Sequence, residues 1–305
     1  MYRTADGIPM TIAIDLSYTA PASLEEALEA LAAGNGRIAL LAGGTDLVPW
    51  MRDGLAAPEL VIDLKRIPGL DRVEVVDDTL HVGCLATFTD LLHAPVVRER
   101  VPVLAEMAGM VASVGVRNRA TMVGNICAAV PCCDAGPVLL ALGAEVHVAG
   151  PRDGRLIPID DWFAGPRETT IQPGEIVTHV TLPLPDPAHG AAYARLSRTR
   201  GEDLAQASVA VLAEPGHRYR VAFGAVAPTP VRAARIEDRL DGNPLGPEVL
   251  EDAVALVPEE VQPITDVRAT ERYRLRMCEV MLRRALTAAT GRAAGDGPAY
   301  GTPLM

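Results

Sequence analysis

Two short segments, each combining glycine with a hydroxyl or amide side chain, have the composition of phosphate-binding turns. The first is Ala42-Gly43-Gly44-Thr45-Asp46 and the second is Ala120-Thr121-Met122-Val123-Gly124-Asn125. Glycine permits positive φ angles, so that successive main-chain N–H groups can converge on phosphate oxygens. Thr45 and Thr121 each offer a further hydroxyl donor. Because glycine is also common in ordinary tight turns, each segment taken alone indicates only a possible phosphate site.

The sequence lacks the common motifs for binding phosphate, metal ions and iron–sulfur clusters. There is no G-x-x-x-x-G-K-[ST] phosphate loop, and the glycines at 34 and 36 precede a strand where a dinucleotide fingerprint would follow one. The adjacent cysteines Cys132 and Cys133 lack the C-x-x-C spacing of a metal site, and no cysteine run for an iron–sulfur cluster occurs. The histidines are scattered. We therefore expect neither a bound metal nor a catalytic side-chain constellation on this chain.

The elements that must position the two segments can be predicted from periodicity and capping residues. A helix is predicted at 23–34, with Ser23 and Glu26 as a capping box. A strand follows this helix and leads into the first segment. A second strand after the segment completes a βαβ-like unit. The second segment is predicted to be a loop between a helical stretch broken by Pro95 and Pro102 and a further helix. The ranges are strands 37–43, 59–64, 145–149 and 174–185, a hairpin at 72–86 turning at Asp77-Asp78, and helices within 90–113 and 133–144.

A proline-rich linker at 183–190 precedes a different arrangement of elements. Three strand-like stretches are followed by three helical segments. The strands are predicted at 191–197, 206–213 and 218–227, and the helices at about 231–241, 247–257 and 270–290. The glycine- and proline-containing end of the chain is predicted to be a flexible tail.

Length, charge and cysteine content set the broad class of protein. A chain of 305 residues suggests two domains. The net charge of −11 argues against a nucleic-acid surface. No signal peptide and no apolar stretch long enough for a membrane helix are found. Five cysteines without disulfide-like spacing suit a reducing cytoplasm.

Four segments that follow one another along the chain carry a family resemblance: LLAGGTDLVPWMRDG, VRNRATMVGNICAAVPCCDAGPVLLALGAEV, YARLSRTRGEDLAQASVAV and GAVAPTPVRAARIE. Together they resemble the FAD-binding medium subunit of the molybdenum hydroxylases, the family of xanthine dehydrogenase and aerobic carbon monoxide dehydrogenase. The resemblance extends over almost the whole chain.

This resemblance implies an α+β chain. A two-subdomain FAD-binding fold of the vanillyl-alcohol-oxidase-like (PCMH) type would occupy residues 1–185, with subdomains at about 11–64 and 65–185. A small α+β C-terminal domain of the CO dehydrogenase flavoprotein type, with a three-stranded antiparallel sheet plus helices, would occupy 189–291. Residues 292–305 would be the flexible tail.

The resemblance also implies which residues contact FAD. The first turn would hold the pyrophosphate, and the second segment would bind the phosphate and ribitol region. Val123 stands where the family usually has glycine, and valine disfavours positive φ. The residues implied to bind FAD are Leu41, Ala42, Gly43, Gly44, Thr45, Asp46, Leu47, Ala120, Thr121, Val123, Gly124, Asn125, Asp134, Ile176, Val177, Arg195, Asp203 and Leu204.

Several of these positions have a second interpretation. Asp134 would contact the AMP half of FAD or act as a helix N-cap. Ile176 and Val177 would line the adenine or dimethylbenzene edge. Arg195 and Leu204 would lie near the isoalloxazine ring, where a cation stabilises negative charge on reduced flavin; the alternative for Arg195 is a solvated surface side chain.

By resemblance, the chain would be the FAD subunit of a heterotrimeric hydroxylase. A small subunit with two [2Fe–2S] clusters would pass it electrons from a large molybdopterin subunit, and the assembly would be a dimer of heterotrimers. Two main alternatives are a stand-alone FAD-dependent oxidase or dehydrogenase and a flavin-free assembly module. A nucleotide-binding protein of another class would be a third.

Overall fold

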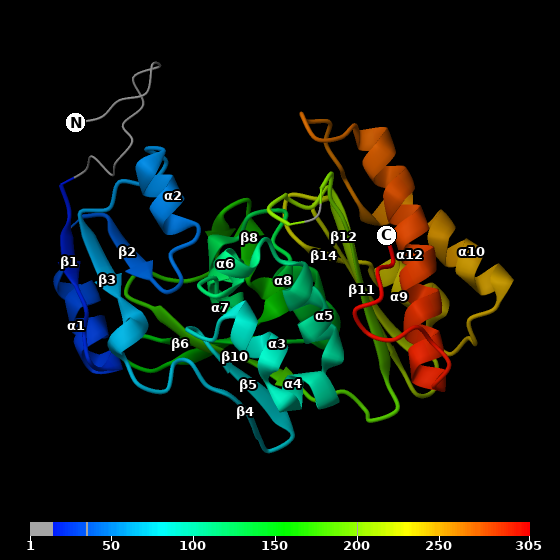
Figure 1. The fold of residues 1–305 in the computed structure, drawn as a ribbon, viewed down its shortest axis with the longest axis horizontal. Helices are drawn as coiled ribbons and strands as arrows, with labels where there is room; N and C mark the ends of the chain where they lie inside the picture. The colour runs from blue at the N-terminus through cyan, green and yellow to red at the C-terminus, as the bar shows by residue number, and fades with distance from the viewer. Residues whose placement is uncertain (1–14, 35, 200) are drawn as a thin grey trace.

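The computed structural model describes residues 15–34, 36–199 and 201–305, and its sheets and helices form three units along the chain (Figure 1). The N-terminal unit is a parallel three-stranded sheet in the order β1-β3-β2. Ser23 caps its first helix, because the side chain accepts the N–H of Glu26 at 3.1 Å. The predicted start of this subdomain at residue 11 lies outside the described residues. The elements are β1 (Ser17–Thr19), α1 (Leu24–Ala33), β2 (Ile38–Leu41), α2 (Leu47–Arg52), β3 (Leu60–Asp63) and η1 (Leu64–Arg66).

The middle unit is an antiparallel sheet of five strands in the order β4-β5-β10-β6-β7. Helices α7 and α8 contact β10, and α3, α4 and α5 pack beside them. Pro95 and Pro102 begin α4 and α5, so the predicted helix breaks are confirmed. The elements are β4 (Val73–Val76), β5 (Thr79–Gly83), α3 (Phe88–His93), α4 (Pro95–Arg100), α5 (Pro102–Met110), α6 (Val114–Arg117), α7 (Met122–Ala128), α8 (Ala135–Leu142), β6 (Glu145–Ala149), β7 (Arg155–Pro158), η2 (Ile159–Asp161), β8 (Phe163–Gly165), β9 (Glu168–Thr169) and β10 (Ile176–Pro183).

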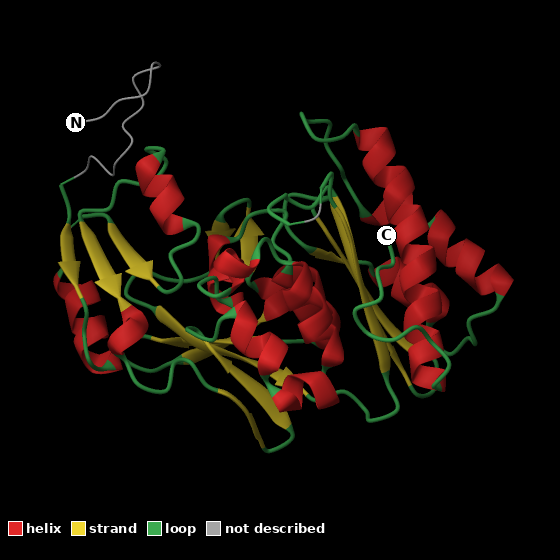
Figure 2. Cartoon of the chain, in the orientation of Figure 1, coloured by secondary structure: helices red, strands yellow, loops and turns green. Residues whose placement is uncertain are grey.

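The C-terminal unit is an antiparallel sheet in the order β11-β12-β13-β14. Helix α12 covers one face of the sheet, and α5 and α8 of the middle unit contact its strands from the other side (Figure 2). The predicted sheet of three strands is present, with β14 as a two-residue addition where the sequence predicted the start of a helix. The elements are β11 (Gly190–Leu196), β12 (Ala207–Glu214), β13 (Arg218–Gly224), β14 (Val231–Arg232), α9 (Ala234–Leu240), α10 (Pro247–Ala255), α11 (Val257–Glu260) and α12 (Glu271–Ala294).

The C-terminal segment 292–305 is anchored, so the prediction of a flexible tail is wrong. Helix α12 continues to Ala294, past the expected domain end at 291. The buried Arg292 side chain forms an ion pair with Glu106 of α5 at 2.8 Å, and the N–H of Gly301 donates to the same carboxylate at 2.9 Å. The Tyr300 ring lies 4.0 Å from the Arg292 guanidinium. These contacts fix the segment against the middle unit.

Candidate cofactor-binding site

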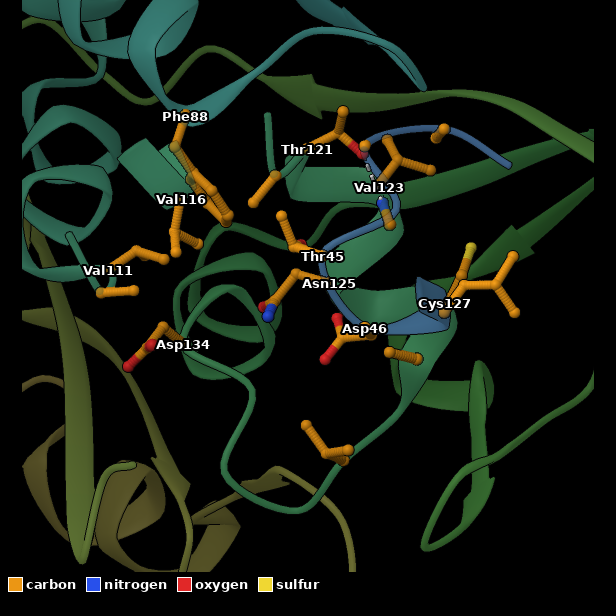
Figure 3. Close-up of a pocket in the computed structure, with 18 of the residues that line it drawn as sticks. Thr45, Asp46, Phe88, Val111, Val116, Thr121, Val123, Asn125, Cys127 and Asp134 are labelled. Carbon is orange, nitrogen blue, oxygen red and sulfur yellow. Dashed lines mark hydrogen bonds between the residues drawn. The ribbon is translucent and has the colours of Figure 1, made fainter. Parts of the chain in front are cut away.

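A cavity of about 640 Å³ lies where the three units meet. Its walls come from the turn between β2 and α2, from α7 and the residues around it, and from the loop between β11 and β12. Figure 3 shows Thr45, Thr121 and Asn125 gathered in the same part of this pocket, although they come from distant parts of the sequence. The volume is in the range of small-molecule and cofactor sites.

The turn between β2 and α2 offers main-chain donors to the cavity. Gly44 has a φ of 76°, a conformation that glycine adopts without steric cost. At Gly43 a Cβ would lie 2.0 Å from the carbonyl oxygen of Arg119 and 3.0 Å from Cα of Ala120, so this turn packs directly against the start of the second segment. Within the described ranges, no protein acceptor bonds the N–H groups of Gly43, Gly44, Thr45 or Asp46. An anionic group in the cavity could accept these consecutive donors.

The second segment is the start of helix α7, not the loop that the sequence predicted. Thr121 is the N-cap, and its hydroxyl accepts the N–H of Gly124 at 2.9 Å. Val123 lies in the first turn of the helix with an ordinary negative φ and is buried. The position therefore does not require positive φ, and valine fits it without backbone strain. Capping by Thr121 explains why a polar residue precedes the apolar face of this short helix.

Asn125 links the cavity to the next helix. Its side-chain oxygen accepts the N–H of Ala135, the first residue of α8, at 3.0 Å. The amide nitrogen carries two further donors, and no acceptor for them occurs in the described part of the protein. Asn125 therefore holds α8 with one end and has donors free for a ligand at the other.

We expect Asn125→Ala to weaken binding of the FAD that the resemblance implies by about 1–3 kcal/mol while the chain still folds, because it removes donors to the ligand and one cap on α8. Asn125→Asp is the matched control for the cap, since it keeps an acceptor for Ala135 but replaces the donors with negative charge. FAD titration of both variants checks this. An unchanged dissociation constant in both would remove Asn125 from the ligand contacts.

A buried ion pair between Asp134 and Arg195 closes another end of the cavity. Arg195 Nε donates to Asp134 Oδ1 at 2.7 Å, and the Tyr193 hydroxyl donates to the same oxygen at 2.9 Å. The Arg195 side chain is 6% exposed, so the solvated interpretation is wrong. Asp134 precedes α8 but makes no capping hydrogen bond. Burial raises the pKa of Asp134, although Arg195 opposes the shift.

The loop between β11 and β12 is organised by Asp203. Its carboxylate accepts the N–H of Arg198 at 2.7 Å and the N–H of Leu204 at 3.0 Å. A hydrogen bond from the Arg198 guanidinium, supported by main-chain N–H groups, lowers the pKa of Asp203 to about 2. Asp203 is therefore ionised and committed to its own loop. Leu204 beside it is 47% exposed and lines the cavity.

The structure gathers most of the residues singled out in the sequence around this one cavity. Leu41 and Ile176 are the exceptions: neither lines it, and Ile176 is fully buried in the core. Their neighbours Leu40 and Val177 line it instead, since side chains alternate along a strand. The predicted residues that line the cavity are Ala42, Gly43, Gly44, Thr45, Asp46, Leu47, Ala120, Thr121, Val123, Gly124, Asn125, Asp134, Val177, Arg195, Asp203 and Leu204.

Sequence reasoning missed the apolar wall and three charged residues of the cavity. Trp50, Phe88, Val116 and Ile171 supply apolar surface, and Arg198, Glu202 and Arg268 supply charge. The apolar residues carry no motif that separates them from ordinary core positions. Arg198 and Glu202 lie inside the quoted segment YARLSRTRGEDLAQASVAV, so the sequence offered a signal for them, whereas Arg268 lies outside every quoted segment.

Three scattered histidines meet elsewhere, on neighbouring strands of the middle sheet. His147 and His179 stack with ring centroids 4.1 Å apart, and His81 stacks on His179 at 5.4 Å. Burial, assisted by the other two rings, lowers the pKa of His179 to about 4. None of the three lines the cavity. Among the described residues no cluster suited to a metal ion is found.

Comparison with protein families identifies the fold and its cofactor. The model described as the FAD binding domain in molybdopterin dehydrogenase matches residues 12–185, and the CO dehydrogenase flavoprotein C-terminal domain matches 191–289. The chain belongs to the FAD-binding medium subunits of the molybdenum hydroxylases. It is accordingly part of an oxidoreductase, and FAD is its cofactor.

Curated relatives and solved structures agree with this family. The medium chain of carbon monoxide dehydrogenase from Hydrogenophaga pseudoflava is 32% identical over 91% of this chain and 98% of its own length. The nicotine 6-hydroxylase medium subunit of Paenarthrobacter nicotinovorans is also 32% identical, with the same coverage. A structure of the H. pseudoflava enzyme lacking the Mo-pyranopterin moiety matches with a TM-score of 0.88 and 34% identity, covering 91% of this chain and 98% of that one.

The cavity of this medium subunit fits a dinucleotide with a diphosphate. Because Gly43 and Gly44 have no side chains, their main-chain donors are accessible from the cavity. The apolar wall and the charged end suit different parts of one long ligand.

No helix in the described part of the chain is long and apolar enough to cross a membrane.

Proposed function

We propose that this medium subunit is an electron-transfer station in a molybdenum-containing hydroxylase. It receives electrons from [2Fe–2S] clusters on a small partner subunit and delivers them to an external acceptor. The large molybdopterin subunit oxidises the organic substrate, and the assembly is a dimer of heterotrimers. The observation that carries the proposal is the single cavity that unites both glycine segments with the Asp134–Arg195 pair.

The role of this chain toward FAD is to bind it, orient it and set its electrostatic surroundings. FAD, when bound, can take up electrons one at a time and release them to an acceptor. The main-chain donors of residues 43–46 are suited to the diphosphate, and Thr121 and Asn125 lie beside them. The apolar wall excludes water from the ring system.

The contacts of Asp134 and Arg195 indicate how the cofactor is oriented. Asp134 bonds directly to Arg195, so the two residues contact the same part of the ligand. The sequence had assigned Asp134 to the AMP half and Arg195 to the ring. Since Leu204 and Arg195 belong to one loop-and-strand segment, we assign Asp134 to the ring end as well. The ion pair then lies where reduction adds negative charge.

We further propose that the FAD-binding domain ends near residue 185 and that the C-terminal domain begins near 189, because the segment between β10 and β11 contains no regular element. The C-terminal domain then includes the anchored residues up to 305. A cytoplasmic location is supported by five free cysteines.

Purification of the full chain with its native neighbours tests the function. We expect a flavin absorbance spectrum, co-purification of an iron–sulfur and a molybdopterin subunit, and bleaching of the flavin on addition of the large subunit's substrate only when the small subunit is present. Bleaching by an organic substrate with the isolated chain would favour a stand-alone oxidase or dehydrogenase. A colourless chain that takes up no FAD would contradict both.

A further inference from the structure

Arg268 is a charged residue of the C-terminal unit that reaches the cavity from outside the four quoted motifs. It belongs to the loop before α12 and lines the cavity together with Asp134, Arg195 and Leu204. Its main chain is held on both sides: the N–H donates to Asp266 Oδ1 at 2.8 Å, and the carbonyl accepts Gln206 Nε2 at 2.8 Å. The backbone from which the side chain extends is therefore fixed.

The Arg268 guanidinium has a buried donor without an acceptor. Its Nε is one of four buried side-chain polar atoms that lack a hydrogen-bond partner in the described ranges, and of these residues only Arg268 lines the cavity. Leaving a buried donor unpaired is costly. The two Nη groups of Arg268 also form no hydrogen bond with the described residues and are not among these buried atoms, so they are the donors that a ligand in the cavity can reach.

The other charged groups at this end of the cavity are engaged within the protein. Arg195 pairs with Asp134, Arg198 pairs with Asp203, and Glu202 accepts a hydrogen bond from the Ser113 hydroxyl. The two ion pairs leave little net charge at this end, and the main-chain donors suited to the diphosphate lie at residues 43–46. A neutral ring edge that gains negative charge only on reduction suits this end better.

The same guanidinium acts on the neighbouring Cys132. Burial raises the pKa of this thiol and Asp134 adds to the shift, whereas Arg268 and Arg195 oppose it. Two guanidinium groups and one carboxylate therefore influence a single point on the cavity wall. Arg195 and Arg198 are paired with carboxylates, whereas Arg268 lines the cavity without an ion pair to any described residue.

We propose that Arg268 contacts the oxygen-bearing edge of the flavin ring and stabilises the negative charge that the ring gains on reduction. This inference rests on the proposed function, which places the ring at the Arg195 end. Arg268 thus makes the C-terminal unit a direct determinant of the reduction potential. A cation that interacts more strongly with the reduced than with the oxidised ligand raises that potential.

Arg268→Gln tests the proposal by potentiometric titration of the FAD-loaded full chain. We expect the affinity for reduced FAD to fall about tenfold more than that for oxidised FAD, which corresponds to a two-electron midpoint potential about 30 mV lower. Arg268→Lys should recover most of the potential. Arg272→Gln is the matched control, since it removes the same charge from a nearby exposed position that does not line the cavity, and should leave the potential unchanged.

Two results would overturn the proposal. Equal losses of affinity for both redox states would assign Arg268 to a phosphate, and unchanged affinity and potential would remove it from the site. Arg268→Met replaces the glutamine variant should that one fail to fold. The measurement needs no partner subunit, so a failure to co-purify with electron donors would contradict the proposed function and leave this test intact.

Discussion

Gly43→Ala should abolish most FAD binding and destabilise the chain. The new Cβ would lie 2.0 Å from the carbonyl oxygen of Arg119 and 3.0 Å from Cα of Ala120, so one of the two cavity segments must move. Both neighbours are backbone, which cannot rotate away as a flexible side chain can. Overpacking of this kind typically costs about 1–3 kcal/mol. We expect at least a hundredfold weaker affinity for FAD, because the displaced turn carries the main-chain donors.

FAD titration and thermal unfolding of the Gly43→Ala chain measure the two effects. Gly109→Ala is the matched control: it introduces the same methyl group on an exposed face of α5, where the nearest contact is an ordinary 3.7 Å. This control should be neutral or stabilising by up to about 1 kcal/mol, since alanine favours helix. Normal FAD occupancy in Gly43→Ala would show that the turn does not hold the cofactor.

The local elements of this fold could be predicted because their signals are local. Ser23 caps a helix three residues from its partner, and Pro95 and Pro102 each begin a helix. The turn at Asp77-Asp78 has both φ angles positive, as a tight hairpin turn requires. The family resemblance assigned residues of several distant segments to one site, and most of these residues line one cavity in the structure.

What the sequence could not provide is the pairing of distant side chains. Asp134 and Arg195 are 61 residues apart, and nothing in either motif indicates that one neutralises the other. The same holds for the start of α7, where the glycine of the motif suggested a loop. In the structure Thr121 caps this segment, so its N–H groups belong to the first turn of helix α7. Arg268 lies outside every motif and was identified only because the structure places it in the cavity wall.

The anchored C-terminus gives the second large expected effect, because Glu106 is a buried charge with several partners. Its side chain is fully buried, and its carboxylate accepts Arg292 Nη2 at 2.8 Å and the N–H groups of Tyr193 and Gly301, each at 2.9 Å. The tail was predicted from the glycine and proline residues near the chain end, but these residues disfavour regular structure without preventing tertiary contacts. One carboxylate thus joins the middle unit to β11 and to the chain end.

Glu106→Ala should lower the free energy of unfolding by about 3–5 kcal/mol, because it leaves Arg292 buried without a counter-ion. Glu59→Ala is the matched control: Glu59 pairs with Arg37 at 3.2 Å, but both side chains are more than half exposed, so the loss should stay below about 1 kcal/mol. Urea denaturation of both variants measures the difference.

The double variant Glu106→Ala with Arg292→Ala should lose less free energy of unfolding than the sum of the two single variants, since the effects of substitutions at contacting residues are not additive. Equal, small losses in Glu106→Ala and Glu59→Ala would mean that the C-terminal segment detaches readily in solution, and that β11 holds Arg195 at the cavity without it.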